Sequence, residues 1–294
     1  MRWSVIPAAL AASLMLAAAP LPPALEWKKE IGEANIAWSK KPHAILKIQD
    51  AAYLGEGQSA TLTGTSGKPA SFKWVPGKQQ DGILWVTYKG GKMSGAMHGK
   101  PIDDATFLRG VAIEKNIDLQ GFPTQVSAGV MGVRVMLYNQ LRADALNFKG
   151  VDYFPYDPSY RVTATFKPDP KRPARVFRTS RGTDKQFYLV GSATFTLKGK
   201  TFTLPFYAGD NDPKKITDMS SFFMDDLTGK VTYGAGRYVD VADFGKYPPK
   251  TVTIDFNFAY NPNCARSPFY TCPVATDVLA MEVRAGEKDP HHAH

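Results

Sequence analysis

Hydrophobic and polar positions along the chain predict one helix followed by many strands. Trp27, Ile31, Ala34 and Trp38 recur at the spacing of one helical face, and the opposite face is charged. From there onward, β-branched and aromatic residues occur in short runs separated by Gly, Pro, Asn and Asp, which is typical of strands joined by tight connections. No stretch alternates strands with long helices, which argues against a doubly wound parallel sheet. We expect a mainly β fold, an antiparallel β-sandwich or barrel-like single domain with a short N-terminal helix.

Two segments carry sharper local signals. The alternating runs 193–197 and 201–204 flank Lys198-Gly199-Lys200, a pattern that predicts a hairpin with a glycine-containing turn. Residues 167–173 are rich in proline and charge, and we interpret them as a long loop rather than a domain boundary.

The first residues form a pattern of their own. After Arg2 no charged residue appears before Glu26, and residues 3–19 are mostly apolar. This pattern predicts an export signal over residues 1–24, with an uncertain cleavage site because Pro20 follows the small residue Ala19. A retained anchor is the alternative, since the uncharged run could span a bilayer core of about 30 Å. We expect a periplasmic or secreted protein with one domain over 25–288 and a disordered tail over 289–294.

Composition narrows the class of protein only a little. The 294 residues are 44% hydrophobic and 21% charged, as in a folded globular protein, and they suit one large all-β domain or two ordinary ones. The formal net charge of +9 favours acidic surroundings without naming a partner. A basic stretch over 167–185 has little aromatic interleaving, and export makes nucleic acid a poor partner.

Several kinds of catalytic or cofactor site lack their residues here. No Gly-x-Ser-x-Gly pentapeptide occurs, so a nucleophile elbow is not expected. His43 and His98 stand alone outside the terminal tail, so we expect no metal site. The glycines at 55–57 lack the βαβ setting of a dinucleotide site, and no cofactor is expected.

Cys264 and Cys272 are the two cysteines of the chain and lie in a proline-rich stretch. In an exported protein they are expected to form a disulfide that pins this loop, contributing about 2–3 kcal/mol through the unfolded chain. A redox or metal pair is the alternative, but the spacing is not that of a Cys-x-x-Cys motif.

The last third of the chain carries the most specific motifs. They are Thr-Tyr-Gly-x-Gly-Arg-Tyr at 232–238, Asp-Phe-Asn-x-Ala-Tyr-Asn-Pro-x-Cys-Ala at 255–265, Thr-Cys-Pro at 271–273 and Ala-Gly-Glu-Lys at 285–288. Together they closely resemble the bacterial and archaeal domain-of-unknown-function family 1684, most strongly over 218–288 and more loosely from Trp27 onward. Asn263 departs from the family's second proline, and Asp277-Val278-Leu279 stands where the family commonly has asparagine before its leucine. The resemblance implies a single conserved domain and no established activity.

These motifs contain the candidate functional residues. Arg237 follows two glycines that would let the backbone approach another element or a ligand, and its guanidinium can bind a carboxylate through two hydrogen bonds. One interpretation is an internal ion pair of Arg237 with Asp255 or Glu287. The other is a polar pocket, in which Asp255 and Asn257 share one face of a strand. The pocket would be lined by Arg237, Asp225, Asp255, Asn257 and Tyr260.

Three functions are consistent with this pattern. The leading hypothesis is an exported protein that binds a small anionic or polyhydroxylated ligand. The alternatives are a hydrolase that uses Asp225 and Asp255 as paired carboxylates, and a structural envelope protein. A small polar ligand is the expected partner, and membrane contact is expected only through an uncleaved signal.

Overall fold

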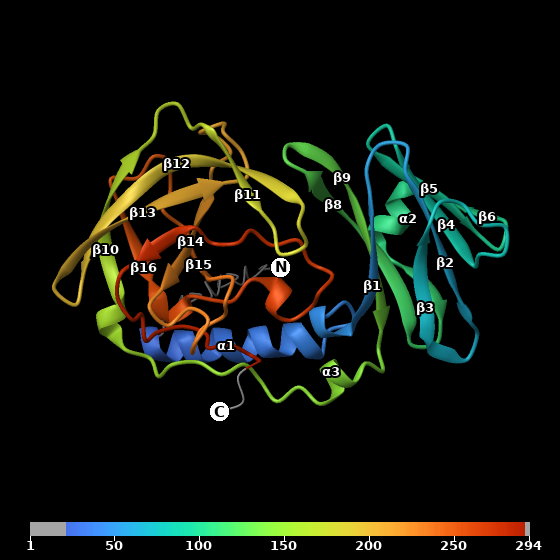
Figure 1. The fold of residues 1–294 in the computed structure, drawn as a ribbon, viewed down its shortest axis with the longest axis horizontal. Coiled ribbons are helices and arrows are strands. Elements are labelled where there is room, and N and C mark those ends of the chain that lie inside the picture. Colours follow the sequence, from blue (N-terminus) through green and yellow to red (C-terminus); the bar gives the residue numbers. More distant parts are fainter. Residues whose placement is uncertain (1–21, 292–294) are drawn as a thin grey trace, which may run out of the picture.

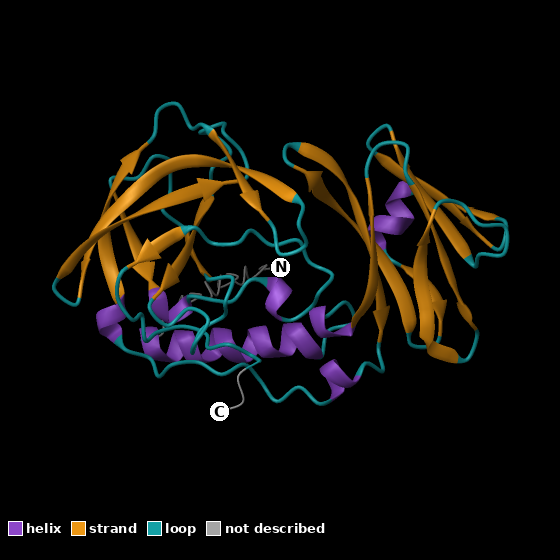
Figure 2. Cartoon of the chain, in the orientation of Figure 1, coloured by secondary structure: helices purple, strands orange, loops and turns teal. Residues whose placement is uncertain are grey.

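The structure, a computed structural model, describes residues 22–291 and has two lobes built around separate hydrophobic cores (Figures 1 and 2). The expected signal at 1–24 lies outside the described residues except for its last three, of which Pro23 and Ala24 begin the first helix. None of the helices within 22–291 is both long enough and apolar enough to cross a membrane.

The N-lobe, which we define as residues 48–139, is a sandwich of two antiparallel sheets. One sheet has the strand order β1-β9-β8-β7 and the other has the order β3-β2-β4-β5-β6. The short helix α2 contacts β5 and β8, one strand from each sheet. The elements are β1 (Ile48–Leu54), β2 (Ser59–Thr65), β3 (Lys68–Pro76), β4 (Leu84–Lys89), β5 (Lys92–Met97), β6 (Lys100–Ile102), α2 (Asp104–Arg109), β7 (Val111–Glu114), β8 (Ile117–Ser127) and β9 (Val130–Asn139).

The C-lobe, which we define as the strands after β9 together with helix α1, contains one strongly curved sheet (Figure 1). Its main path is β15-β14-β13-β12-β10-β16; β11 pairs with β12, and β17 runs parallel to β14. The strands are β10 (Arg161–Pro168), β11 (Ala174–Arg178), β12 (Asp184–Leu197), β13 (Lys200–Ala208), β14 (Asp218–Asp225), β15 (Arg237–Ala242), β16 (Thr251–Asp255) and β17 (Asp277–Leu279). Helices and turns outside the N-lobe are α1 (Pro23–Ser39), η1 (Ile45–Lys47), α3 (Ala143–Leu146), η2 (Pro158–Tyr160), η3 (Phe256–Phe258) and η4 (Asn263–Ala265).

The first helix, α1, contacts η1 and α3, which follow it, and it is also attached to segments near the end of the chain. The Trp27 indole nitrogen donates to the backbone oxygen of Asn257 at 2.9 Å, and its ring contacts Tyr153 and Tyr156. At the other end of the helix, the Arg266 guanidinium lies 3.8 Å from the centroid of the Trp38 ring. The two tryptophans that predicted the helical face therefore both anchor it to the C-lobe.

The predicted fold class is confirmed. The described chain is mainly antiparallel β, with the expected N-terminal helix and with the expected hairpin between β12 and β13, whose turn residues Lys198 and Gly199 have positive φ. Residues 169–173 form the expected loop between β10 and β11. The sequence predicts one domain, and the structure has two large cores made from separate stretches of chain, with two smaller hydrophobic clusters besides. The sequence also places Asp289 in a frayed tail, but Asp289 is buried and its backbone N–H donates to Val231.

Candidate functional site

Arg237 is completely enclosed and forms the centre of a buried ion pair. Its Nη2 lies 3.2 Å from Asp225 Oδ2, and both side chains are essentially inaccessible to solvent. The guanidinium also donates to the backbone oxygens of Val283, Ala285 and Glu287. Burial lowers the pKa of Arg237, while the Asp225 carboxylate opposes that shift. The arginine therefore ties β15 to the terminal segment of the chain.

Asp225 is held by three further donors. The Val283 backbone N–H lies 2.8 Å from Oδ2, and the hydroxyls of Thr228 and Thr232 donate to Oδ1. The sequence predicts that Arg237 pairs with Asp255 or Glu287. This prediction is wrong, because each of these two carboxylates is paired with another arginine. Their partners are Arg161 for Asp255 and Arg266 for Glu287.

The glycine before this arginine explains how the pair becomes enclosed. Gly236 has φ +83°, and a Cβ at this position would lie 2.7 Å from the Phe223 oxygen and 2.5 Å from the Ala275 Cβ. The backbone thus approaches another segment of the protein closely, as one of the two sequence interpretations predicts.

Asn257 is a second buried anchor. Its side-chain amide accepts from the Asp157 N–H and donates to the Asp157 oxygen, both at 2.9 Å, and it also donates to Asp255 Oδ1 at 2.8 Å. The sequence predicts that Asp255 and Asn257 share one face of a strand, but the strand ends at Asp255, and Asn257 belongs to η3. Asp255 instead caps that turn by accepting from the Asn257 N–H.

Two of the five predicted residues, Asp255 and Tyr260, line a cleft of about 490 Å³ on the C-lobe. The cleft lies where β15, β16 and β10 meet α1, and we call it the acidic cleft. It contains five carboxylates and one guanidinium. Its charged residues are Glu26, Glu30, Arg161, Asp240, Asp243 and Asp255.

Hydrogen bonds order one wall of the acidic cleft. The Tyr260 hydroxyl donates to Asp240 Oδ2 at 2.9 Å, and the Ser220 hydroxyl donates to Asp240 Oδ1 at 2.6 Å. Asp240 is exposed, yet the protein atoms around its carboxylate desolvate it enough to raise its pKa, and the two hydroxyls oppose that shift. Burial and the neighbouring Glu26 raise the pKa of Glu30. Arg161 Nη1 lies 3.1 Å from Asp255 Oδ2 on the other wall.

Sequence reasoning missed Asp240 and Arg161. The alternation of Tyr238, Val239, Asp240 and Val241 shows which face of β15 is buried, because Val239 and Val241 lie in the core. That pattern could have placed Asp240 on the opposite face. Nothing in the sequence brings Arg161 to Asp255, since that contact depends on the register of β10 against β16.

The expected disulfide is absent: Cys264 and Cys272 are free thiols and do not lie at bonding distance. The Cys264 backbone N–H approaches Cys272 Sγ at 3.3 Å, and the Tyr233 hydroxyl approaches Cys264 Sγ at 3.8 Å. Backbone hydrogen bonds hold this loop in place of the predicted disulfide. Ala265 bonds to Pro262, and Ser180 bonds to Cys272.

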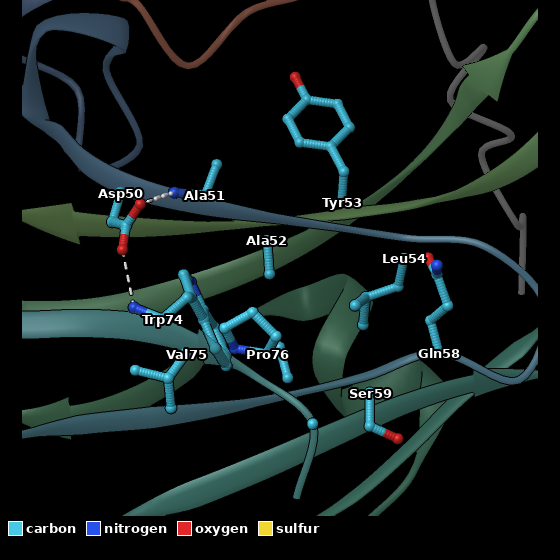
Figure 3. A pocket seen from close by; sticks show the side chains of 12 residues that line it. Asp50, Ala51, Ala52, Tyr53, Leu54, Gln58, Ser59, Trp74, Val75 and Pro76 are labelled. Carbon is cyan, nitrogen blue, oxygen red and sulfur yellow. Dashed lines mark hydrogen bonds between the residues drawn. The ribbon is translucent and has the colours of Figure 1, made fainter.

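A cavity of about 550 Å³ opens in the N-lobe between the edge strands β1 and β3 (Figure 3). In this view Ala52 and Leu54 point into the sandwich while Tyr53 points away from it. The Asp50 carboxylate bridges the two sheets by accepting from the Trp74 N–H at 2.7 Å. The indole nitrogen of Trp74 is buried and has no hydrogen-bond partner among the described residues.

A two-lobed antiparallel β protein, with a buried arginine–aspartate pair closing its C-lobe, is the class that this architecture defines. Residues 146–288 match the sequence model of a family described as "Protein of unknown function (DUF1684)", and the chain belongs to that family. The match covers the C-lobe strands, and β1–β9 precede it.

One similar solved structure is the solution NMR structure of an uncharacterized protein of Haloarcula marismortui. It is 30% identical, with coverage of 50% of this chain and 80% of that one, and its TM-score is 0.42. No curated protein matches the chain.

Proposed function

We propose that the protein is exported and that its C-lobe binds a small polyhydroxylated ligand in the acidic cleft. The apolar, uncharged start of the chain supports export. The observation that carries the binding proposal is the placement of Asp240, Tyr260, Asp255 and Arg161 around one open cleft. Ionised carboxylates accept hydrogen bonds at two oxygens each, which suits neighbouring hydroxyl groups, and Arg161 adds donors.

The charge of the cleft favours a polyhydroxylated ligand over an anionic one. Five carboxylates face one guanidinium, and that guanidinium is already paired with Asp255. An added anion would meet repulsion, whereas a neutral hydroxylated molecule would not. Tyr260 and Phe258 supply apolar surface for the carbon face of such a ligand.

The alternative of a hydrolase using Asp225 and Asp255 loses its geometric basis. Only Asp255 lines the cleft, while the Asp225 side chain is enclosed against Arg237. Paired carboxylates must flank the same bond to act as acid and base. This pair therefore does not support hydrolysis.

Thermal unfolding of the protein with neutral sugars and polyols tests the proposal. We expect a saturable rise in unfolding temperature with at least one compound of a panel comprising glucose, trehalose, myo-inositol and glycerol. D240N should abolish that rise while leaving the unliganded protein folded, because the amide keeps the shape of the carboxylate. D218N, which changes an exposed carboxylate of β14 outside the cleft, is the matched control. A response to spermidine alone would contradict the proposed ligand class.

A second candidate function rests on Trp74. The N-lobe cavity is largely apolar, and the buried indole N–H of Trp74 has no partner in the described part of the chain. A small aromatic molecule with one acceptor oxygen would satisfy that donor. With 1-naphthol as the probe, we expect one indole N–H resonance to shift, and W74F to remove that resonance. An unmoved Trp74 resonance at millimolar probe would reject this candidate.

A further inference from the structure

Three cationic side chains gather where the two lobes meet. Arg134 from β9 lies with its guanidinium carbon 4.4 Å from the centroid of the Tyr270 ring and 5.5 Å from that of Phe122. Burial lowers the pKa of Lys185 at the start of β12, the Arg134 charge lowers it further, and Cys272 opposes that shift. Arg181 precedes Lys185 in the same connection and lies 5.6 Å from the Tyr53 ring.

The register of the N-lobe sheet explains why these groups face the C-lobe. Arg134 is directly opposite Phe122 on β8 and Tyr53 on β1, so the three side chains share one face of the sheet. The Tyr53 hydroxyl crosses to the C-lobe and donates to the Phe269 oxygen at 2.7 Å. Tyr270, the next residue, lies over Arg134.

A second contact fixes Lys185 beside this face. The Gln125 side chain of β8 donates to the Gln186 oxygen at 2.9 Å and accepts from the Gln186 N–H at 2.8 Å. Because Lys185 immediately precedes Gln186, its position is set by the same cross-lobe pair. The position of Lys185 is therefore set by contacts that do not involve its own charge.

Neither Arg134 nor Lys185 has an acidic partner. Among residues 22–291, no carboxylate lies within ion-pair distance of either side chain, and Arg134 Nε is buried without a hydrogen-bond partner. The neighbouring Asp184 is paired with Arg178 instead. Aromatic faces attract a guanidinium but carry no net charge, so they do not neutralise Arg134 or Lys185.

We propose that the cationic groups of Arg134 and Lys185 form a binding site between the lobes for a compact tetrahedral oxyanion, a phosphate or sulfate group. An anion there would accept from the unpartnered Nε of Arg134 and from the Lys185 ammonium. It would neutralise two like charges that half-burial makes costly. Arg181 already donates to the Pro268 oxygen at 2.7 Å and contributes charge from the rim. This site lies apart from the acidic cleft and does not depend on the function proposed for it.

Unfolding temperature measured against inorganic phosphate, with sodium chloride keeping ionic strength constant, tests the site. We expect a saturable rise of about 3–5 °C at ten times the dissociation constant. R134Q and K185Q should each weaken phosphate binding at least tenfold. R178Q is the matched control, because that arginine ends β11 in the same hairpin but is paired with Asp184 and exposed. Line broadening of the phosphorus NMR signal gives a second measure of binding that does not depend on stability.

Three outcomes would overturn the proposal. One is a rise equal to that in chloride alone. Another is a phosphate response that both R134Q and K185Q retain. The third is binding only to a long polyanion such as polyphosphate, since a steep dependence on salt without phosphate binding marks a diffuse basic surface rather than a built site. If R134Q does not fold, K185Q alone decides, because the Lys185 ammonium belongs to no ion pair within the described chain.

Discussion

Arg237 shows that a residue in a specific motif can serve the fold rather than a ligand. Its guanidinium meets one carboxylate and three carbonyl oxygens without reaching a cavity. Removing one member of such a buried pair leaves the other charge without compensation, which is costlier than losing the pair as a whole.

We therefore expect R237M to lower the free energy of unfolding by about 3–5 kcal/mol. Urea denaturation measures the effect, and the double variant R237M/D225L should recover part of it because no uncompensated charge remains. R161M is the control, since that arginine is partly exposed and also pairs with an aspartate. Equal losses for R237M and R161M would show that burial does not set the strength of the pair.

The two thiols should differ in reactivity. Hydrogen bonds from Cys272, Ser180 and Tyr233 lower the pKa of Cys264, while the hydrogen bond to Cys264 and burial raise the pKa of Cys272. A lowered pKa means that the Cys264 thiolate is populated at lower pH than in a free cysteine. Iodoacetamide labelling across pH, read by mass spectrometry, should modify Cys264 first and at the lower pH. Cys272 should react only after unfolding, and equal labelling of both would contradict this.

At the scale of elements, two glycines should respond oppositely to the same change. Gly32 lies inside α1 with nothing near its missing Cβ, whereas Gly286 has φ +79° and its Cβ would lie 2.4 Å from the Ala259 oxygen. G32A should raise the free energy of unfolding by about 0.5–1 kcal/mol, because alanine is the better helix former.

G286A should instead lower the free energy of unfolding by more than about 1 kcal/mol, because alanine neither fits the space nor favours that backbone angle. Urea midpoints of the two variants provide the comparison. A stabilising G286A would mean that the terminal segment is not packed as described.

Elements with a local signal could be predicted from the sequence, and contacts between distant segments could not. Helix α1 and the hairpin turn at Lys198-Gly199 could both be predicted, because the residues that indicate them lie close together in the sequence. The strand that was expected to hold both Asp255 and Asn257 ends at Asp255, and Asn257 bonds instead to Asp157, a partner 100 positions away. The partner of Arg237 likewise depends on which strands lie side by side, and no periodicity contains that information. The sequence thus predicted two residues of the acidic cleft, Asp255 and Tyr260, but not the others that line it.

At the scale of the whole molecule, Gln125 links the lobes through two hydrogen bonds to Gln186. We expect Q125L to speed hydrogen exchange of the Gln186 amide by about 2- to 10-fold, since a typical hydrogen bond contributes about 0.5–1.5 kcal/mol. Q120L is the control, because Gln120 bonds to Leu108 within the N-lobe. Unchanged exchange in Q125L would show that other contacts hold the lobes together.

The path of the chain also sets an order of events during synthesis. Trp27 is among the first described residues to leave the ribosome, yet its partner Asn257 follows 230 positions later. At about 5–20 residues per second, the helix waits roughly 10–50 s for its binding surface. The intervening N-lobe is completed sooner, and its first and last strands pair with each other at Ile48 and Tyr138. The N-lobe can therefore fold first. Helix α1 and the C-lobe strands, which lie before and after the N-lobe in the sequence, pack together only later.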